Sequence, residues 1–224
     1  MVMAAPLTES CARPLASREH VCIGVSPFNS YFSVQRIADL ARWARRSFDS
    51  FQFFVPDRVA AHTLRALGYP PERAEHKAAR QGQYVHNKIC RALAEVGITD
   101  VAGYILDSAT LLGNSAYQRL SLRVHTEFAD NPEFAEQCMQ ASGWVLEKRL
   151  PAGTPATREQ LTHAVRYFLA EIPMFLDTVA IAGVSSSVFA YHQRVGFLER
   201  LYQHELALTP HPAQGFVVLT EEEL

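Results

Sequence analysis

The sequence HVCIGVS at residues 20–26 is a short run of apolar and β-branched residues that ends at the turn-forming residues Ser26, Pro27, Phe28 and Asn29. A run of this length and composition is typical of a buried β-strand. Ser33 then stands where the N-cap of a helix is expected. After it, apolar residues recur at helical spacing, at Ile37, Leu40, Ala41, Ala44 and Phe48. A buried strand followed directly by an amphipathic helix is typical of the first unit of an α/β sheet.

Strand and helix patterns alternate along the rest of the chain. Further strands are predicted at residues 51–55, 102–106, 179–182, 187–191 and 215–219. Helices are predicted at residues 58–67, 72–96, 114–129, 132–150 and from Thr157 to about residue 177, with Asn131 and Thr157 as capping residues. Because strands and helices alternate, we predict a Rossmann-like α/β fold with a doubly wound, mainly parallel sheet flanked by helices. In such a sheet the functional site lies beyond the carboxyl ends of the strands.

The length and composition indicate one large domain. The chain has 224 residues, of which 48% are hydrophobic and 20% are charged. We expect residues 20–224 to form a single Rossmann-like domain and residues 1–19 to be a flexible N-terminal tail, because the tail lacks the cationic start and apolar block of a secretory signal. No apolar run approaches the ~18–20 residues of a membrane span. We therefore expect a cytoplasmic protein with no membrane partner.

Neither a metal site nor a cofactor is predicted. The four cysteines are widely spaced and form no C-x-x-C pair, which argues against a disulfide framework or a structural zinc site. His125-Thr126-Glu127 matches one half of the zinc deaminase signature, but the P-C-x-x-C half is missing. The glycine-rich G-x-G-x-x-G and P-loop patterns are also missing.

Positive charge is concentrated in residues 33–91, which hold eleven Arg and Lys against five Asp and Glu, a net +6, whereas the remainder carries −8. Within the predicted helix at residues 72–96, side chains three or four residues apart form one stripe along a single face. They are Arg73, Lys77, Arg80, Tyr84, Lys88 and Arg91. Contact with phosphates, with one aromatic ring interleaved, would explain this stripe. A solvated helix face would explain it equally well.

Several residues could carry chemistry, although each has an ordinary structural explanation. Ser26 follows the first strand, but the G-x-S-x-G elbow of hydrolases needs a second glycine where Phe28 stands. Tyr167 and Glu171 lie four residues apart on one helix face among apolar neighbours, where an unpaired glutamate is costly. A solvated glutamate is the simpler alternative for that helix. Tyr191-His192 ends a predicted strand, where a core tyrosine beside a surface histidine is equally ordinary, and Asn29 fits a turn or a cap.

Taken together, these segments resemble the cyclodipeptide synthase family. Residues 20–26 match the pattern H-x-[LVI]-[LVI]-G-[LVI]-S with at most one substitution, at Cys22, and residues 167–173 match Y-x-x-x-E-x-P. Residues 28–33 and 186–192 look like two further landmarks of the family. Asn29, Tyr191 and His192 together indicate its Asn-Tyr-His branch. The resemblance extends from about residue 20 to residue 219.

The resemblance implies a catalytic domain related to those of class I aminoacyl-tRNA synthetases but without their ATP chemistry, since neither H-I-G-H nor K-M-S-K-S is present. It implies that two aminoacyl-tRNAs are the substrates, that no cofactor is needed, and that enzymes modifying diketopiperazines are possible downstream partners. Ser26 would accept the first aminoacyl group as an ester. A second aminoacyl-tRNA would give a dipeptidyl-enzyme, which cyclises to a 2,5-diketopiperazine and frees the serine.

The family also implies roles for individual residues. Tyr167 and Glu171 would hold the substrate amine and move its proton. Gly24, Asn29 and Tyr191 would position the ester and its oxyanion, with His192 as support. The tRNA would contact Arg73, Lys77, Arg80, Lys88 and Arg91, with Arg36, Arg42, Arg45 and Arg46 as further candidates. The first aminoacyl pocket would be lined by Cys22, Met174 and Phe189, which implies a small or medium, uncharged first residue.

Two other classes of protein stay open at this point. A serine-dependent acyltransferase or hydrolase would use Ser26 with His192, would need an acidic partner for the histidine, and would act without tRNA. A non-catalytic tRNA-binding module would keep the basic stripe and tolerate loss of Ser26.

Overall fold

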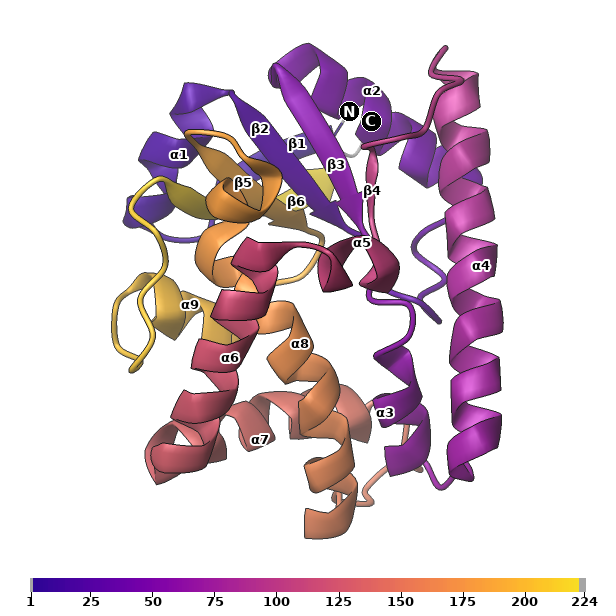
Figure 1. Ribbon diagram of the computed structural model, residues 1–224, viewed down its shortest axis with the longest axis vertical. Helices are drawn as coiled ribbons and strands as arrows, with labels where there is room; N and C mark the ends of the chain where they lie inside the picture. The colour runs from indigo at the N-terminus through magenta and orange to yellow at the C-terminus, as the bar shows by residue number, and fades with distance from the viewer. Residues whose placement is uncertain (1, 222–224) are drawn as a thin grey trace.

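The computed structural model describes residues 2–221, which contain a six-stranded sheet with the strand order β1-β6-β5-β2-β3-β4 (Figure 1). The strands are β1 Val2–Pro6, β2 His20–Gly24, β3 Ser50–Phe54, β4 Ile105–Leu106, β5 Ser187–Tyr191 and β6 Gln214–Glu221. Every pairing is parallel except that of β1 with β6. The predicted α/β fold with a mainly parallel sheet is therefore confirmed.

Helices cover both faces of this sheet. They are α1 Ala12–Ser17, α2 Val34–Ser47, α3 Ala60–Ala66, α4 Pro71–Glu95, α5 Ser108–Leu112, α6 Ser115–Asp130, α7 Pro132–Glu147, α8 Arg158–Ala182 and α9 Gly196–Tyr202, and a 3₁₀ turn at Glu9–Cys11 precedes α1. Val21 and Ile23 of β2 pack against α2 and α4, whereas Cys22 packs on the side of α8. Since successive strand residues point to opposite faces, β2 is buried on both. No helix within residues 2–221 has the length and apolar character to cross a membrane.

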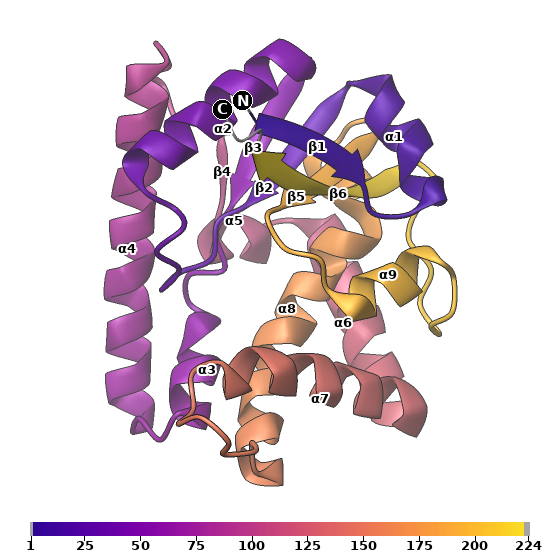
Figure 2. The ribbon, with the colours of Figure 1, turned by 180° about the vertical axis from the view of Figure 1, so that it is seen from behind.

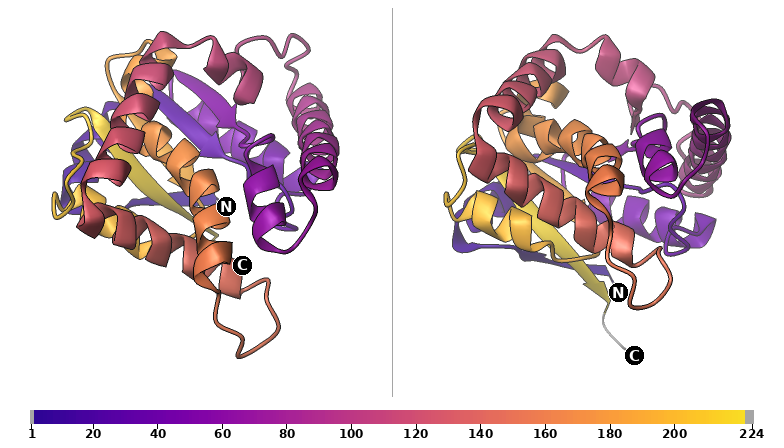
Figure 3. Two further views of the ribbon diagram at one scale, coloured as in Figure 1. Left: turned by 60° about the horizontal axis from the view of Figure 1, so that its bottom comes forward. Right: turned by 90° about the horizontal axis from the view of Figure 1, so that it is seen from below.

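The cluster of helices beyond the carboxyl edge of the sheet builds the lower half of the molecule (Figure 1). Here α6, α7 and α8 pack against one another, and the short helix α3 lies between α4 and α8 (Figure 3). This arrangement places the middle of α8 and the end of α7 opposite the ends of β2 and β5. The edge where a site is expected therefore faces a wall of helices.

The predicted helix starts have the expected local causes. The Ser33 hydroxyl accepts a hydrogen bond from the backbone N–H of Arg36, and the Asn131 side chain caps α7. Thr157 and Gln160 form a reciprocal capping box at the start of α8. Each of these caps satisfies backbone donors that the first helical turn leaves without partners.

The expectation of a flexible tail over residues 1–19 is wrong for the described residues 2–19. Val2–Pro6 form β1, which pairs antiparallel with β6 and covers its edge (Figure 2). Leu7 is 5% exposed and Cys11 is fully buried. A strand of five small or medium residues has only a weak sequence pattern. It is held in place by pairing with β6, which is more than two hundred residues away in the sequence. Met1, from the expected tail, and residues 222–224, from the expected domain, lie outside the described residues.

The predicted strand at residues 179–182 is also wrong, because these residues continue α8. Asp177 departs from helical geometry with φ −160° and ψ 64°, and its carboxylate accepts from the backbone N–H of Ala180. The helix thus restarts with its own cap, and it ends at Gly183 in the left-handed conformation, φ 72°. The run of β-branched residues suggested a strand, but burial of Val179 and Ile181 against the core favours the helix. The helices α1, α5 and α9 were not predicted.

Candidate active site

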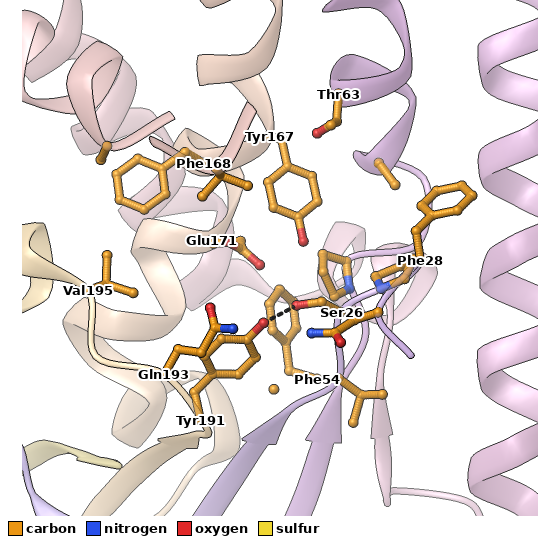
Figure 4. A pocket seen from close by; sticks show the side chains of 18 of the residues that line it. Ser26, Phe28, Phe54, Thr63, Tyr167, Phe168, Glu171, Tyr191, Gln193 and Val195 are labelled. Atoms are coloured by element: carbon orange, nitrogen blue, oxygen red, sulfur yellow. Dashed lines mark hydrogen bonds between the residues drawn. The ribbon is translucent and has the colours of Figure 1, made fainter. Parts of the chain in front are cut away.

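A cavity of about 350 Å³ opens at the carboxyl ends of β2 and β5. Ser26 follows β2, Tyr191 ends β5, and α8 contributes Tyr167 and Glu171. Figure 4 shows the side chains of these four residues converging on the same space. Residues that are distant in the sequence, which we predicted from motifs alone, are thus brought together by the parallel pairing of β2 with β5 and by the approach of α8.

Ser26 and Tyr191 are linked directly. The Ser26 Oγ and Tyr191 Oη atoms are 3.0 Å apart (Figure 4). Tyr167 lies close enough to Ser26 and Glu171 for both groups to influence the pKa of its hydroxyl. The serine hydroxyl is therefore hydrogen-bonded to one phenol and lies near a second phenol and a carboxyl group.

The electrostatics of Glu171 suit proton transfer to or from an amine. Burial raises the pKa of this carboxyl from 4.5 to about 8, while a hydrogen bond from Tyr167 acts in the opposite direction. Burial, together with the neighbouring Glu171 charge, raises the pKa of Tyr167 well above its usual range. A carboxyl that titrates near neutral pH can take up or release a proton at little cost.

Asn29 lines the cavity and contacts His192, which lies beside it. The Asn29 side-chain amide lies 3.4 Å from Nε2 of His192, and its carbonyl accepts from the backbone N–H of Tyr31 at 3.0 Å. The Tyr31 ring stacks on His192 at 4.0 Å, nearly parallel. Burial lowers the pKa of His192 to about 4, and Arg36 adds to the effect, so this imidazole is neutral at physiological pH.

The contacts of His192 argue against a serine hydrolase. Its Nε2 is directed at Asn29 and not at Ser26, and its Nδ1 has no hydrogen-bond partner among the described residues. A Ser-His-acid triad needs one histidine nitrogen directed at the serine hydroxyl and the other bonded to an acidic side chain. His192 also does not line the cavity within the part of the chain that the structure describes.

Gly24 is required by packing. A Cβ at this position would lie 2.9 Å from two atoms of the Phe189 ring and 3.3 Å from the Tyr191 ring. Glycine therefore allows β5 to present both rings to the cavity.

The inner wall of the cavity is apolar. It is lined by Phe54, Phe168, Phe175, Phe189, Leu198 and Phe216. Of the three predicted pocket residues, only Phe189 lines it, and Cys22 and Met174 are fully buried in the core instead. Neighbouring helix positions point about 100° apart, so Phe175 faces the cavity where Met174 cannot. Cys22 lies two residues deeper in β2 than Gly24 and is closed off from the cavity.

The sequence patterns did not predict the part of the cavity that α7 and the residues after it supply. Trp144, Val145, Lys148 and Arg149 line the mouth, and Trp144 is 44% exposed. The Lys148 ammonium lies 3.2 Å from the centre of the Trp144 ring. The sequence signal that could have indicated this region is a tryptophan four residues before a Lys-Arg pair. Only the tertiary fold brings it to the ends of the strands.

The basic stripe lies on the outer face of α4. Arg73, Arg80 and Arg91 are exposed, and Tyr84 between them is 54% exposed. The two lysines are held by neighbours, since Lys77 donates to the Tyr69 hydroxyl and Lys88 donates to the backbone carbonyl of Phe32. The stripe therefore keeps three exposed arginines, while Lys88 anchors α4 to the loop that follows Ser26.

Comparison with known proteins agrees with this arrangement. The family model of the cyclodipeptide synthases matches residues 2–221. The chain is 31% identical over 223 residues to the cyclo(L-leucyl-L-leucyl) synthase of Bacillus subtilis, covering 98% of this chain and 89% of that protein. It is 32% identical over 219 residues to the cyclo(L-tyrosyl-L-tyrosyl) synthase of Mycobacterium tuberculosis H37Rv, covering 97% of this chain and 75% of that protein.

Solved structures of cyclodipeptide synthases have the same fold as this chain. A cyclodipeptide synthase from Bacillus thermoamylovorans superimposes with a TM-score of 0.91 at 27% identity, covering 99% of this chain and 97% of that one. A Mycobacterium tuberculosis protein superimposes with a TM-score of 0.87 at 32% identity, covering 99% of this chain and 94% of that one. The latter structure was described as demonstrating that cyclodipeptide synthetases are related to type I tRNA synthetases.

The fold and the serine-centred cavity thus define an α/β enzyme of the type related to tRNA synthetases. The chain belongs to the cyclodipeptide synthase family, whose enzymes make cyclic dipeptides from aminoacyl-tRNAs.

Proposed function

We propose that this enzyme forms its cyclic dipeptide through covalent intermediates on Ser26. The observation that carries the proposal is the position of the Ser26 hydroxyl, 3.0 Å from the Tyr191 hydroxyl and at the mouth of an apolar cavity beside Glu171. A nucleophile in this position can reach an ester whose side chain occupies the cavity.

In the first step, Ser26 Oγ attacks the ester carbonyl of an aminoacyl-tRNA. The new acyl–Oγ bond replaces the bond to the ribose oxygen, and that oxygen leaves with the proton of the serine. The Tyr191 hydroxyl orients Oγ and can donate to the developing oxyanion. Glu171 and Tyr167 hold the α-amino group of the substrate, and the carboxylate is the form of Glu171 that pairs with its ammonium.

In the second step, the amine of the Ser26-bound aminoacyl group attacks the ester carbonyl of a second aminoacyl-tRNA. This amine must first lose a proton, which the Glu171 carboxylate can accept, because a pKa of about 8 makes its protonated form stable near neutral pH. The product is a dipeptidyl-enzyme and a free tRNA. The terminal amine of the dipeptide then attacks the Ser26 ester, which closes the second peptide bond and returns the proton to Oγ.

The substrate that the cavity favours has an apolar side chain. Phenylalanines form most of the inner wall, together with Val195 and Leu198, and these side chains offer no charge or hydrogen bond to a polar substrate side chain. The relatives make cyclo(L-leucyl-L-leucyl), cyclo(L-tyrosyl-L-tyrosyl) and cyclo(L-leucyl-L-phenylalanyl) products. We therefore propose an uncharged first residue of leucine or aromatic type, which extends the expectation of a small or medium residue to larger side chains.

We assign the enzyme to the Asn-Tyr-His branch of the family, on the contacts among Asn29, Tyr191 and His192. The exposed face of α4 is proposed to contact tRNA phosphates through Arg73, Arg80 and Arg91, with Lys77 and Lys88 as lesser contributors because their ammonium groups already have partners. We place the reaction in the cytoplasm, where aminoacyl-tRNAs are made. Enzymes that modify diketopiperazines are the partners to which its product would pass.

The experiment that tests this function is product analysis after expression in a bacterial host. Mass spectrometry of the culture medium should detect cyclic dipeptides from the wild-type enzyme and none from Ser26→Ala, although the variant folds and still binds tRNA. Cyclic dipeptides from Ser26→Ala at the wild-type level would contradict the assignment. Their absence from the wild-type culture, with folded protein present, would favour a tRNA-binding module instead.

A further inference from the structure

The backbone of Phe28 adopts a conformation that aromatic residues rarely take. Its φ is 61°, in the left-handed region, where the Cβ of an L-residue is crowded by the backbone. Phe28 stands two residues after Ser26 in the loop between β2 and α2. A bulky residue in this conformation persists where its surroundings impose it, and such positions are concentrated at functional sites.

The loop fixes Phe28 from both sides. Pro27 before it is buried, and Asn29 after it is held by the backbone N–H of Tyr31 and by His192. The Phe28 ring packs toward α3 against the cluster of Ala60, Ala61 and Leu64. The left-handed turn therefore directs Asn29 toward β5 and the Phe28 ring toward α3.

The ring lies at the mouth of the cavity and remains partly exposed. In Figure 4 it lies on the opposite side of Tyr167 from Phe168 and Val195, which also line the cavity. The guanidinium carbon of Arg149 lies 6.0 Å from the centre of the Phe28 ring. Direct stacking would bring the two planes to about 3.5–4 Å, and a flat ring inserted between them needs about 7 Å. A small shift of the Arg149 side chain would therefore open a slot for a planar group.

The substrate places a planar group near this slot. The aminoacyl ester that reaches Ser26 is attached to the ribose of the 3′-terminal adenosine, so the adenine must lie just outside the reacting ester. Side chains recognise unpaired bases by stacking them on aromatic rings and arginine planes. Phe28 offers the ring and Arg149 offers the guanidinium, both beside the entrance.

We propose that Phe28 is the stacking platform for the terminal adenine of the aminoacyl-tRNA, with Arg149 covering the opposite face of the base. This inference rests on the proposed use of aminoacyl-tRNA by Ser26. It assigns a function to a ring that neither touches the reacting atoms nor belongs to the inner pocket.

The test pairs one change in the protein with one change in the substrate. Two aminoacylated RNA minihelices are compared, one ending in adenosine and one whose terminal nucleotide keeps its ribose but lacks the base. The rate and half-saturating concentration for acylation of Ser26 are measured for the wild type, Phe28→Leu and Phe28→Tyr. Phe28→Gly, which accepts the left-handed backbone freely, serves as a second ring-deletion variant if the leucine variant does not fold.

With the adenosine-ended substrate, Phe28→Leu should raise the half-saturating concentration about tenfold. Phe28→Tyr keeps an aromatic ring, so its half-saturating concentration should stay close to that of the wild type. With the base-free substrate, wild type and Phe28→Leu should become equal, because the partner of the ring is gone. A loss in Phe28→Leu that is just as large on the base-free substrate would overturn the proposal and leave Phe28 a packing residue of α3. If the wild type fails to acylate Ser26 with the adenosine-ended substrate, the proposed function itself fails.

Discussion

Gly24 and Phe189 face each other across β2 and β5 at a distance that leaves no space for a methyl group. A Cβ at residue 24 would lie 2.9 Å from both Cε1 and Cζ of the Phe189 ring. The same ring stacks on Phe216 and contacts Phe175 edge to face, so it has little freedom to move away. The glycine of the first motif and the phenylalanine of β5 therefore set the floor of the substrate cavity together.

The first prediction concerns this pair. Gly24→Ala should displace the Phe189 ring into the cavity and lower the yield of cyclic dipeptide at least tenfold. Phe189→Leu in the same chain should recover part of the activity, because it removes the atoms that the methyl group meets. Product yield and thermal unfolding are measured for the two single variants and the double variant. If the double variant is no better than Gly24→Ala, the contact does not explain the loss.

The size of the Phe189 side chain should limit which amino acids the cavity accepts. Phe189→Ala enlarges the inner cavity, and the spectrum of cyclic dipeptides should shift toward bulkier apolar residues, since a methylene of fit is worth only about 1–3 kcal/mol of discrimination. Product profiling by mass spectrometry measures this shift. An unchanged spectrum would show that this side chain does not limit the pocket.

The second prediction concerns the amine-holding pair. Glu171→Gln keeps the shape of the side chain but cannot carry the charge or accept the proton, so turnover should fall by about 10²-fold or more. Tyr167→Phe removes one hydrogen bond and should lose less. Both rates are measured with saturating aminoacyl-tRNA. Normal turnover by Glu171→Gln would mean that another group handles the amine.

The third prediction is a pH dependence of stability. The Glu171 carboxyl titrates near 4.5 when solvated and near 8 in the folded enzyme, because burial disfavours its charged form. Between these pH values the folded state holds a proton that the unfolded chain has released. The free energy of unfolding should therefore fall as pH rises through this window, by at most about 1.4 kcal/mol per pH unit.

Glu171→Gln lacks this titration and supplies the control. Denaturant unfolding is measured from pH 5 to pH 9 for both proteins. The stability of the variant relative to the wild type should increase up to about pH 8 and then level off. A difference that stays constant across this range would contradict the raised pKa.

The fourth prediction concerns the outer face of α4. Arg80→Glu and Arg91→Glu should weaken binding of aminoacyl-tRNA and reduce the steepness of its salt dependence by roughly one phosphate contact each. Arg123→Glu is the matched control, because it reverses an exposed arginine on α6 with the same change in net charge. Affinity is measured by filter binding at several salt concentrations. Equal losses in Arg123→Glu would point to a general effect of charge and not to a contact made by α4.

Local sequence patterns predicted the elements that depend on interactions between residues close together in the sequence. The apolar run at residues 20–24, the Ser33 cap and the Tyr167–Glu171 spacing all correspond to elements of the structure. The strand β1 escaped prediction because its order comes from pairing with β6. The β-branched Val179 and Ile181 are compatible with the strand predicted at residues 179–182, whereas packing keeps these residues helical.

Sequence motifs predicted the polar residues of the site but not all of the residues that line its mouth and wall. The motif residues other than His192 line one cavity, because they end or follow parallel strands or face those strands from α8. Trp144 and Arg149 were missed because only tertiary packing brings α7 to the mouth of that cavity. Met174 was chosen where Phe175 lines the wall, since a one-residue error on a helix rotates a side chain by about 100°.

The most direct test of the account is the covalent state of Ser26. The wild-type enzyme is mixed with one radiolabelled aminoacyl-tRNA, quenched in acid and digested, and the labelled peptide is identified by mass spectrometry. We expect a single aminoacyl ester on the peptide that contains Ser26, its loss when a second aminoacyl-tRNA is added, and no label on Ser26→Ala. Label on any other peptide, or cyclic dipeptide formed with Ser26 never acylated, would contradict it.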